Sequence, residues 1–415
     1  MQKKIIALAV AGLVSGGAFA QANVTVSGNI GVSYNSYSLS GATVNRVTYR
    51  QNLLSDESSA IILKGEENLG NGLTAWFQID NRLTMDRGNG ATNANATLGV
   101  QTSGLGNGNT AIGFKGNFGS IGFGRWDMHY DAFAPIGDVV TAGALASRIG
   151  YFGIMAQVQS GAASTQVGFG TRASNVIMYD TPTWNGFNAR VAVSTAGGSG
   201  EGEAFTTGTN GDAGNGSTYQ IRLNYNNGPI NAVYSYFNNK VEGRGNYTAA
   251  WALTAAGAFT NTSTPNAAPN PADQVSNRLG GAYTFPMGVK VGLGWDRTTV
   301  KNNTAAGDFT RTAWMLPVSY TMGNHMFNFT YAKAGQATGT TAAGGSTDSN
   351  AKEYMLAYGY NFSKRTSVGM QYLNLKNNSA GIYSLHGASN ANTGLTGPAA
   401  GEDSTLLSFN VRHFF

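Results

Sequence analysis

The sequence predicts an all-β protein, a 16-stranded antiparallel transmembrane β-barrel, and three observations carry this prediction. The 415 residues include 58 glycines and only 11% charged side chains, whereas a soluble globular domain carries about 25% charged residues. Segments of about ten residues alternate between apolar and polar side chains, as strands between lipid and water do. Short turns and long polar connections separate these segments in alternation, which is the asymmetry of an outer-membrane barrel.

The first twenty residues have the pattern of a secretory signal peptide. Two lysines precede a short apolar run, and Ala18-Phe19-Ala20 forms a cleavage site of small residues. The apolar run is too short to span a bilayer as a helix. We therefore predict a cleaved signal peptide, residues 1–20, and one transmembrane barrel domain, residues 21–415.

The strands begin directly after this segment. In the first, Val24, Val26 and Ile30 share one face, while Thr25 and Ser27 lie on the other. Tight turns join the strands in pairs, and Asn-Gly turns among them are strong hairpin signals. In chain order we predict Val24–Tyr37, Ala60–Glu66, Leu73–Leu83, Thr110–Phe118, Ile121–Trp126, Asn175–Thr181, Phe187–Thr195, Tyr219–Tyr225, Ile230–Asn238, Leu279–Phe285, Val289–Trp295, Thr310–Tyr320, His325–Ala332, Glu353–Phe362, Thr366–Leu375 and Ser404–Phe415.

Residue chemistry argues against catalysis and against bound cofactors. The chain has no cysteine, so neither disulfides nor thiolate metal sites can form. The basic residues are scattered singly and do not form the patch that nucleic-acid binding needs. We therefore predict no enzyme activity, no cofactor, no metal site and no nucleic-acid partner. The four histidines lack metal-ligand spacing: His129, His325, His386 and His413.

The last predicted strand ends on an aromatic residue. Leu407, Phe409 and Val411 share its apolar face, and the chain stops on Phe415. This ending resembles the final strand of bacterial outer-membrane barrels. In that group the terminal aromatic residue is a recognition signal for the barrel-assembly machinery, and the resemblance gives Phe415 the same role.

Several motifs, in the correct order, resemble the Gram-negative porin family, most closely the trimeric porins of β-proteobacteria. The first is Lys-Gly-Glu-Glu-Asn-Leu-Gly-Asn-Gly-Leu-Thr-Ala, beginning at Lys64; the others are Gly116–Ser120 with Gly124-Arg125, Asn175–Pro182 and Val411–Phe415. The resemblance implies a homotrimer among the lipid and lipopolysaccharide of a Gram-negative outer membrane, passing small hydrophilic solutes. It also implies that the long loop after the fifth strand, residues 127–172, folds inward and narrows the pore.

Strand parity and family position together predict the charges at this constriction. Rings of charged side chains set ion selectivity in channels. Arg125 has outward parity, which fits only if its strand is kinked or ends there. The predicted basic wall is Lys64, Arg82, Arg125 and Arg172, and the predicted loop charges are Asp127, Asp131, Asp138 and Arg148.

Parity also places further charges on the inner face. Two positions where the family carries constriction arginines hold Ala60 and Met178 here, so we expect only a weak anion preference. Away from the constriction we predict solvated lumen charges at Arg190, Arg278, Arg311 and Arg412. The remaining inward charges are Arg222, Lys290, Glu66, Asp80, Asp296 and Glu353.

Three alternatives to a diffusion channel remain open at this stage. A substrate-selective channel would show saturable flux for one solute. A structural or adhesive surface barrel would not conduct. A soluble secreted β-protein would fold in buffer without detergent.

Overall fold

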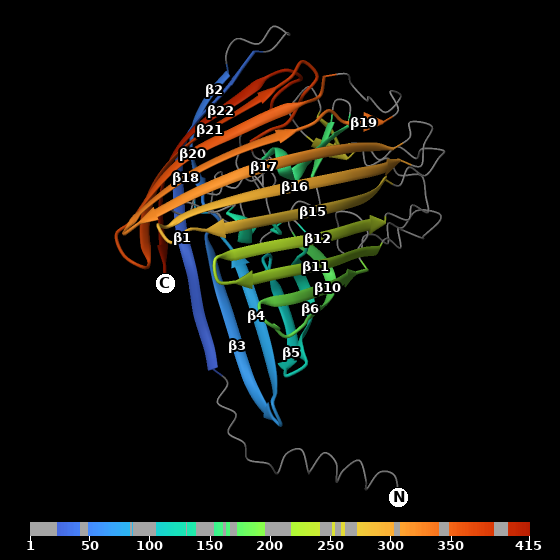
Figure 1. The fold of residues 1–415 in the computed structure, drawn as a ribbon, viewed down its shortest axis with the longest axis vertical. Coiled ribbons are helices and arrows are strands. Elements are labelled where there is room, and N and C mark those ends of the chain that lie inside the picture. The colour runs from blue at the N-terminus through green and yellow to red at the C-terminus, as the bar shows by residue number, and fades with distance from the viewer. Residues whose placement is uncertain are drawn as a thin grey trace, which may run out of the picture.

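In the computed structural model, antiparallel strands form a closed ring, and the connections between them lie at its two ends (Figure 1). Among the described residues no helix is long and apolar enough to cross a membrane. The structure describes residues 23–41, 49–83, 85, 105–129, 131–137, 153–160, 163–166, 172–195, 217–240, 251–253, 259–261, 272–302, 308–339, 348–385 and 397–415.

Sixteen strand positions make up the ring, as the alternating pattern predicts. Each strand pairs with the next one along the chain, and the last pairs with the first. The strands are β1 (Asn23–Ser40), β3 (Ala60–Gly70), β4 (Leu73–Arg82), β5 (Thr110–Gly116), β6 (Gly119–Asp127), β9 (Arg172–Asp180), β10 (Phe187–Ser194), β11 (Ser217–Asn227), β12 (Ile230–Lys240), β15 (Ala272–Thr284), β16 (Val289–Asn302), β17 (Phe309–Met322), β18 (His325–Ala334), β20 (Ala351–Asn361), β21 (Thr366–Asn377) and β22 (Asp403–Phe414).

Short strands extend this ring at two positions. β2 (Tyr49–Asp56) pairs with the second half of β1, and β3 pairs with its first half, so β2 and β3 share one position. β19 (Thr338–Gly339) pairs with β17 where β18 has ended. The sequence analysis did not predict β2, β19 or two separate hairpins: β7 (Gln157–Ser160) with β8 (Ala163–Gln166), and β13 (Trp251–Leu253) with β14 (Phe259–Asn261).

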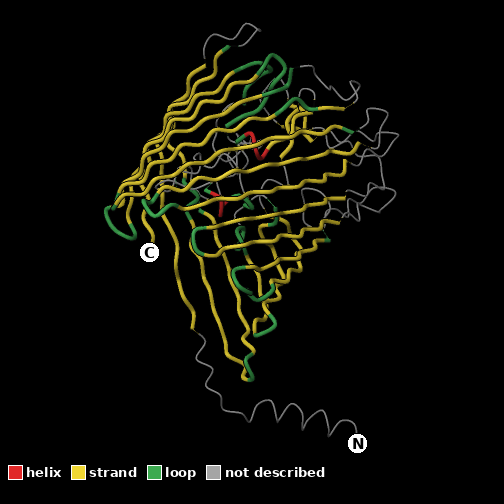
Figure 2. Tube along the Cα trace, in the orientation of Figure 1, coloured by secondary structure: helices red, strands yellow, loops and turns green. Residues whose placement is uncertain are grey.

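The two faces of the sheet differ in the way that the alternation predicts. In β22, Phe409 and Val411 are exposed on the outer face, whereas Ser404, Ser408 and Asn410 are buried on the inner face. Strands make up nearly all of the ring, and loops join them at its ends (Figure 2). Polar side chains therefore line the interior, and apolar side chains form the surface that lipid covers.

Glycine and asparagine close the hairpins at one end of the ring. Between β3 and β4, Asn71 and Gly72 have φ angles of 51° and 76°. Asn185 and Gly186 repeat this pattern between β9 and β10, with φ angles of 48° and 88°. Two successive residues with positive φ define the turn type that matches the twist of a β-hairpin. The predicted Asn-Gly turns are thereby confirmed.

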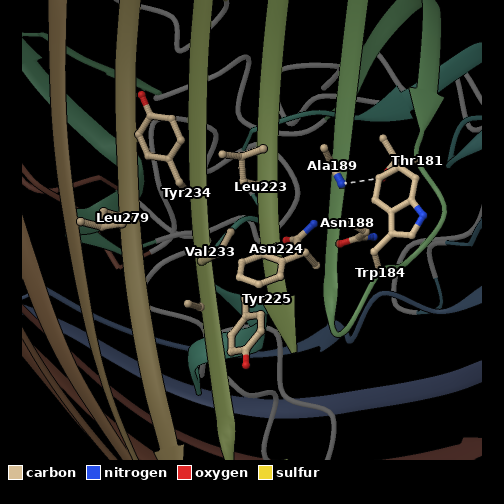
Figure 3. Close-up of a pocket in the computed structure, with 12 residues that line it drawn as sticks. Thr181, Trp184, Asn188, Ala189, Leu223, Asn224, Tyr225, Val233, Tyr234 and Leu279 are labelled. Carbon is tan, nitrogen blue, oxygen red and sulfur yellow. Dashed lines mark hydrogen bonds between the residues drawn. The ribbon is translucent and has the colours of Figure 1, made fainter. Parts of the chain in front are cut away.

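Aromatic side chains surround a shallow pocket on the outer face beside these turns (Figure 3). Trp184, Phe187 and Tyr225 contribute to its lining with the smaller Ala189 and Ala232. The Phe187 and Tyr225 rings pack with centroids 4.3 Å apart. Aromatic side chains at this level are typical of the boundary between the apolar band of a barrel and the headgroups.

Candidate functional site

The loop after β6 folds back against the inner face of the sheet. Its described parts include a first limb, residues 127–129 and 131–137, and a second limb, residues 153–160, which is followed by β8. The first limb includes the 3₁₀-helix η1 (Ala134–Ile136), which contacts β12, β15 and β16. The second includes η3 (Ile154–Ala156), which contacts β17, β18 and β20. Most of the side chains described in the two limbs are buried, and wall residues such as Arg222, Arg278 and Arg311 bond to them.

Polar contacts attach the first limb to four neighbouring wall strands. Asp131 Oδ1 lies 2.8 Å from Arg222 Nη1 of β11. The His129 ring bonds Ser235 of β12 and Ser276 of β15. The fourth strand is β16, whose Lys290 donates to the Pro135 carbonyl at 2.6 Å. Polar bonds as well as apolar packing therefore hold the first limb against the wall.

A cluster of three charged wall residues, Arg278, Asp296 and Arg311, holds the second limb. Asp296 accepts from Arg278 Nε at 2.9 Å and from Arg311 Nη1 at 2.7 Å. Both guanidiniums also donate to the Met155 carbonyl, at 3.0 and 3.1 Å. Beside the cluster, Glu353 accepts from the Ile154 N–H at 2.9 Å. The wall thus satisfies backbone groups that an irregular loop leaves without partners.

The structure corrects the prediction that Arg278 and Arg311 are solvated lumen charges. Their side chains, and that of Asp296, are 0% exposed. Strand parity identified the correct face but could not show that the loop packs over these positions. Arg190 is partly exposed and pairs with Asp180 through two bonds of 2.7 and 2.9 Å. Arg412 is partly buried, with its guanidinium 4.6 Å from the centre of the Phe414 ring.

A second polar network joins residues of β4, β6 and β9. Arg82 donates to Asp80 Oδ2 at 2.7 and 3.1 Å, and Arg172 Nε lies 3.3 Å from Asp127 Oδ1. Asn109 connects the two pairs, because it donates to both carboxylates and accepts from Arg172 at 2.9 Å. The structure therefore brings together three of the predicted constriction residues, Arg82, Asp127 and Arg172.

The other predicted site residues have different outcomes. Lys64 lies opposite Gln78 in the β3–β4 register and is exposed. Arg125 donates to Ser174 Oγ at 2.8 Å, where the β6–β9 register shifts between Gly124 and Trp126. This irregularity is the kinked strand that its outward parity required. Asp138 and Arg148 lie outside the described residues, as do His386 and residues 1–20.

Apolar side chains stand at the two positions where the resembling family carries arginine. Ala60 is fully buried on the inner face. Met178 is buried in a cluster against which Trp76 and Trp126 pack, with the two indole centroids 6.1 Å apart. Neither position therefore contributes a charge to the wall, as the sequence indicates.

Sequence reasoning missed the neutral residues that organise the site. Asn109, Ser235 and Ser276 carry no charge and occur in no motif. Alternation does place Ser235 inward, but Ser276 precedes the predicted strand Leu279–Phe285. Their partners are distant in sequence: 106 residues separate His129 from Ser235, and 147 separate it from Ser276. Among the described residues, no three His, Cys, Asp or Glu side chains are grouped as a metal site requires.

A ring of sixteen antiparallel strands with polar residues inside and a loop on its inner wall defines an outer-membrane channel protein. Residues 7–380 match the model of the Gram-negative porin family, and the chain belongs to this family. It is a general porin of the Gram-negative outer membrane, a channel with no enzymatic activity. The prediction of the family is confirmed.

Its relatives include β-proteobacterial porins. Outer membrane porin protein 32 of Delftia acidovorans is 28% identical over 420 residues, covering both chains in full. An outer membrane porin protein of Bordetella pertussis is 26% identical, with 89% of this chain and 92% of that protein covered.

Two solved structures show the same fold. The anion-selective porin from Comamonas acidovorans has a TM-score of 0.63 at 23% identity, with 95% of this chain and 100% of that chain covered. OmpT of Vibrio cholerae has a TM-score of 0.59 at 11% identity, with 95% and 98% covered.

Proposed function

We propose that the channel is narrowed by the loop of residues 127–172 and passes small hydrophilic solutes with a weak preference for anions. The observation that carries this proposal is the set of arginine–carboxylate pairs on the inner wall around the docked loop. Rings of charge in a narrow, water-filled pore set selectivity. Four such pairs keep partial exposure: Arg82–Asp80, Arg172–Asp127, Arg190–Asp180 and Arg222–Asp131.

Pairing explains why the preference is weak. Each pair is neutral as a whole, so little net field acts on a passing ion. The Arg82–Asp80 pair is asymmetric, because the arginine side chain is 32% exposed and the aspartate side chain only 2%. Lys64 and Arg125 add positive charge, whereas Ala60 and Met178 withhold two further cations. The name of the Comamonas acidovorans structure, an anion-selective porin, agrees with the sign of this proposal.

The test is planar-bilayer recording of detergent-purified protein under a KCl gradient. We expect stepwise ohmic openings and a zero-current potential of the sign that indicates a small excess of chloride permeation. A potential of the opposite sign would mean that Asp127 and Asp131 dominate the narrowest region. Absence of conductance from correctly folded barrels would refute the diffusion channel altogether.

Substitution of Arg82 tests which charge sets the sign. Arg82→Gln leaves Asp80 without its cation, and we expect the zero-current potential to move toward cation preference. A unit charge about 4 Å from an ion in water contributes about 1 kcal/mol, which is about fivefold in local ion concentration. Arg365→Gln, in an exposed short turn, is the matched control and should leave the potential unchanged.

We also propose the assembly route. Residues 1–20 direct export and are removed, and residues 21–415 form the mature barrel. Phe415 is recognised by the barrel-assembly machinery, and three barrels associate in a membrane of lipid and lipopolysaccharide. Conductance steps that arrive in threes would support the homotrimer, and single steps together with a monomeric mass in detergent would contradict it.

A further inference from the structure

His129 is fully buried between the first limb and the wall. Its Nδ1 lies 2.9 Å from Ser235 Oγ and its Nε2 lies 2.8 Å from Ser276 Oγ. The ring stacks on Phe237 at a centroid distance of 5.3 Å and an interplanar angle of 27°. The backbone at this point is attached as well, because Gln220 donates to the Met128 carbonyl at 2.5 Å.

The surrounding hydrogen bonds place a proton on Nε2 of the ring. The Ser276 hydroxyl has one proton, and its other neighbours are Asp296 Oδ2 at 3.2 Å and Thr298 Oγ1 at 2.8 Å. Thr298 donates its own proton to Asp296, so Ser276 donates toward these two groups. Ser276 must then accept from Nε2–H. In the neutral ring, His129 Nδ1 accepts from the Ser235 hydroxyl.

Positive charges surround this ring on the wall side. Arg222 of β11 pairs with Asp131 of the loop. Arg278 of β15 donates to the His129 carbonyl from Nη1 at 3.4 Å. Asp296 of β16 is shared between Arg278 and Arg311 of β17. Both carboxylates are thus already committed to arginines. A proton on His129 would add a buried cation beside carboxylates that already pair with arginines.

We propose that His129 is a proton-operated latch for the first limb, neutral while the limb is docked and charged when the limb leaves the wall. A released limb occupies lumen that a docked limb leaves open, so acid lowers conductance. This inference rests on the proposed narrowing of the pore by the loop.

The sign of the pH dependence follows from linkage. Burial lowers the pKa of the docked His129 well below its usual value, and the nearby Arg278 and Arg222 lower it further. A released imidazole in water titrates near pH 6.5. Docking is therefore independent of pH above about 6.5, and the released fraction rises about tenfold per pH unit below it, until the pKa of the docked ring is reached.

The first experiment is conductance between about pH 7.5 and about pH 5, a range that keeps clear of carboxyl groups with ordinary pKa values near 4. We expect the native channel to lose conductance reversibly below about pH 6.5 and His129→Gln to keep its neutral-pH conductance throughout. His325→Gln, at a strand end away from the loop, should respond as the native channel does. An unchanged response in His129→Gln would overturn the latch.

A disulfide between two introduced cysteines tests the same motion without changing His129. Because the chain has no cysteine of its own, no native thiol can compete for this disulfide. A Cβ at Gly280 would lie 3.0 Å from Ile136 Cγ2, so Ile136→Cys with Gly280→Cys falls within disulfide reach. The conductance of the oxidised channel should not change with acid, and the reduced channel should regain the pH response. An equal pH response in both redox states refutes release of the limb. Absence of conductance from all variants at neutral pH refutes the channel function instead.

Discussion

A single buried carboxylate, Asp296, pairs with both of the arginines that hold the second limb of the loop. Charges taken out of water are tolerated only when paired and hydrogen-bonded. Asp296 meets both conditions, because each of its oxygens accepts from one guanidinium and Thr298 donates a further bond at 2.8 Å. Parity could predict that all three charged residues face inward. It could not predict their burial, because the loop that covers them comes from more than a hundred residues earlier in the chain.

Asp296→Asn should detach the second limb and destabilise the barrel. Removing one member of a buried ionic cluster leaves uncompensated charge, at a cost of about 3–5 kcal/mol. We expect a lower urea midpoint for unfolding in detergent and noisier single-channel currents. Asp308→Asn replaces an exposed acid just before β17 and should change neither. A native midpoint for Asp296→Asn would show that the two arginines do not depend on this carboxylate.

At the scale of one element, the break between β2 and β3 is stabilised by a side chain. Ser59 Oγ accepts from the Gly31 N–H at 3.0 Å and donates to the Gly31 carbonyl at 3.1 Å. Ser58, beside it, has a φ of 58°. The serine gives the Gly31 N–H its partner at the point where β1 changes partner from β2 to β3, while the Gly31 carbonyl also accepts from the Glu57 N–H at 3.0 Å.

Ser59→Ala should weaken this junction. Buried backbone groups that lose a partner cost about 1–3 kcal/mol, so the unfolding midpoint in detergent should fall and amide exchange at Gly31 should accelerate. Ser36→Ala, on the exposed face of β1, is the control for the loss of a hydroxyl. Equal exchange at Gly31 in both variants would mean that water replaces the serine.

The ring strands could be predicted from sequence because alternation is a local property. All sixteen predicted segments coincide with ring strands, usually a few residues too short at the loop end. Leu279–Phe285, for example, covers only the second half of β15 (Ala272–Thr284). β15 continues back to Ala272 through Asn, Ser and Gln residues whose pattern resembles that of a loop. The docked limbs have no periodicity, so neither their contacts with the wall nor the neutral partners of His129 could be predicted.

At the scale of the whole molecule, Phe415 takes part in closing the ring. Its N–H and carbonyl pair with Gly28 at 3.1 and 3.2 Å, and its ring packs over Gly28, where an added Cβ would meet it at 2.7 Å. Recognition during assembly and closure of the barrel therefore involve different parts of the residue: the aromatic ring for the proposed recognition and the backbone for closure.

Phe415→Ala separates these two contributions. Because the backbone bonds remain, we expect near-native folding of purified protein into detergent and a large loss of protein from the outer membrane of cells. Deletion of Phe415 should impair both. Equal loss in detergent and in cells for Phe415→Ala would assign the ring a structural role alone.

The pairing of β1 with β22 gives the barrel one seam that differs from every other contact between its strands. Elsewhere, neighbours in the ring are successive along the chain, and hairpins can form one after another with little loss of chain entropy. The seam joins Asn29–Ser40 to Asp403–Phe414, so it can form only after the final strand has been synthesised. Until then both edges of the sheet present unpaired backbone groups, which are templates for aggregation. A chain that ends before β22 therefore cannot close the sheet. Pairing of β1 with β22 distinguishes complete barrels from truncated ones.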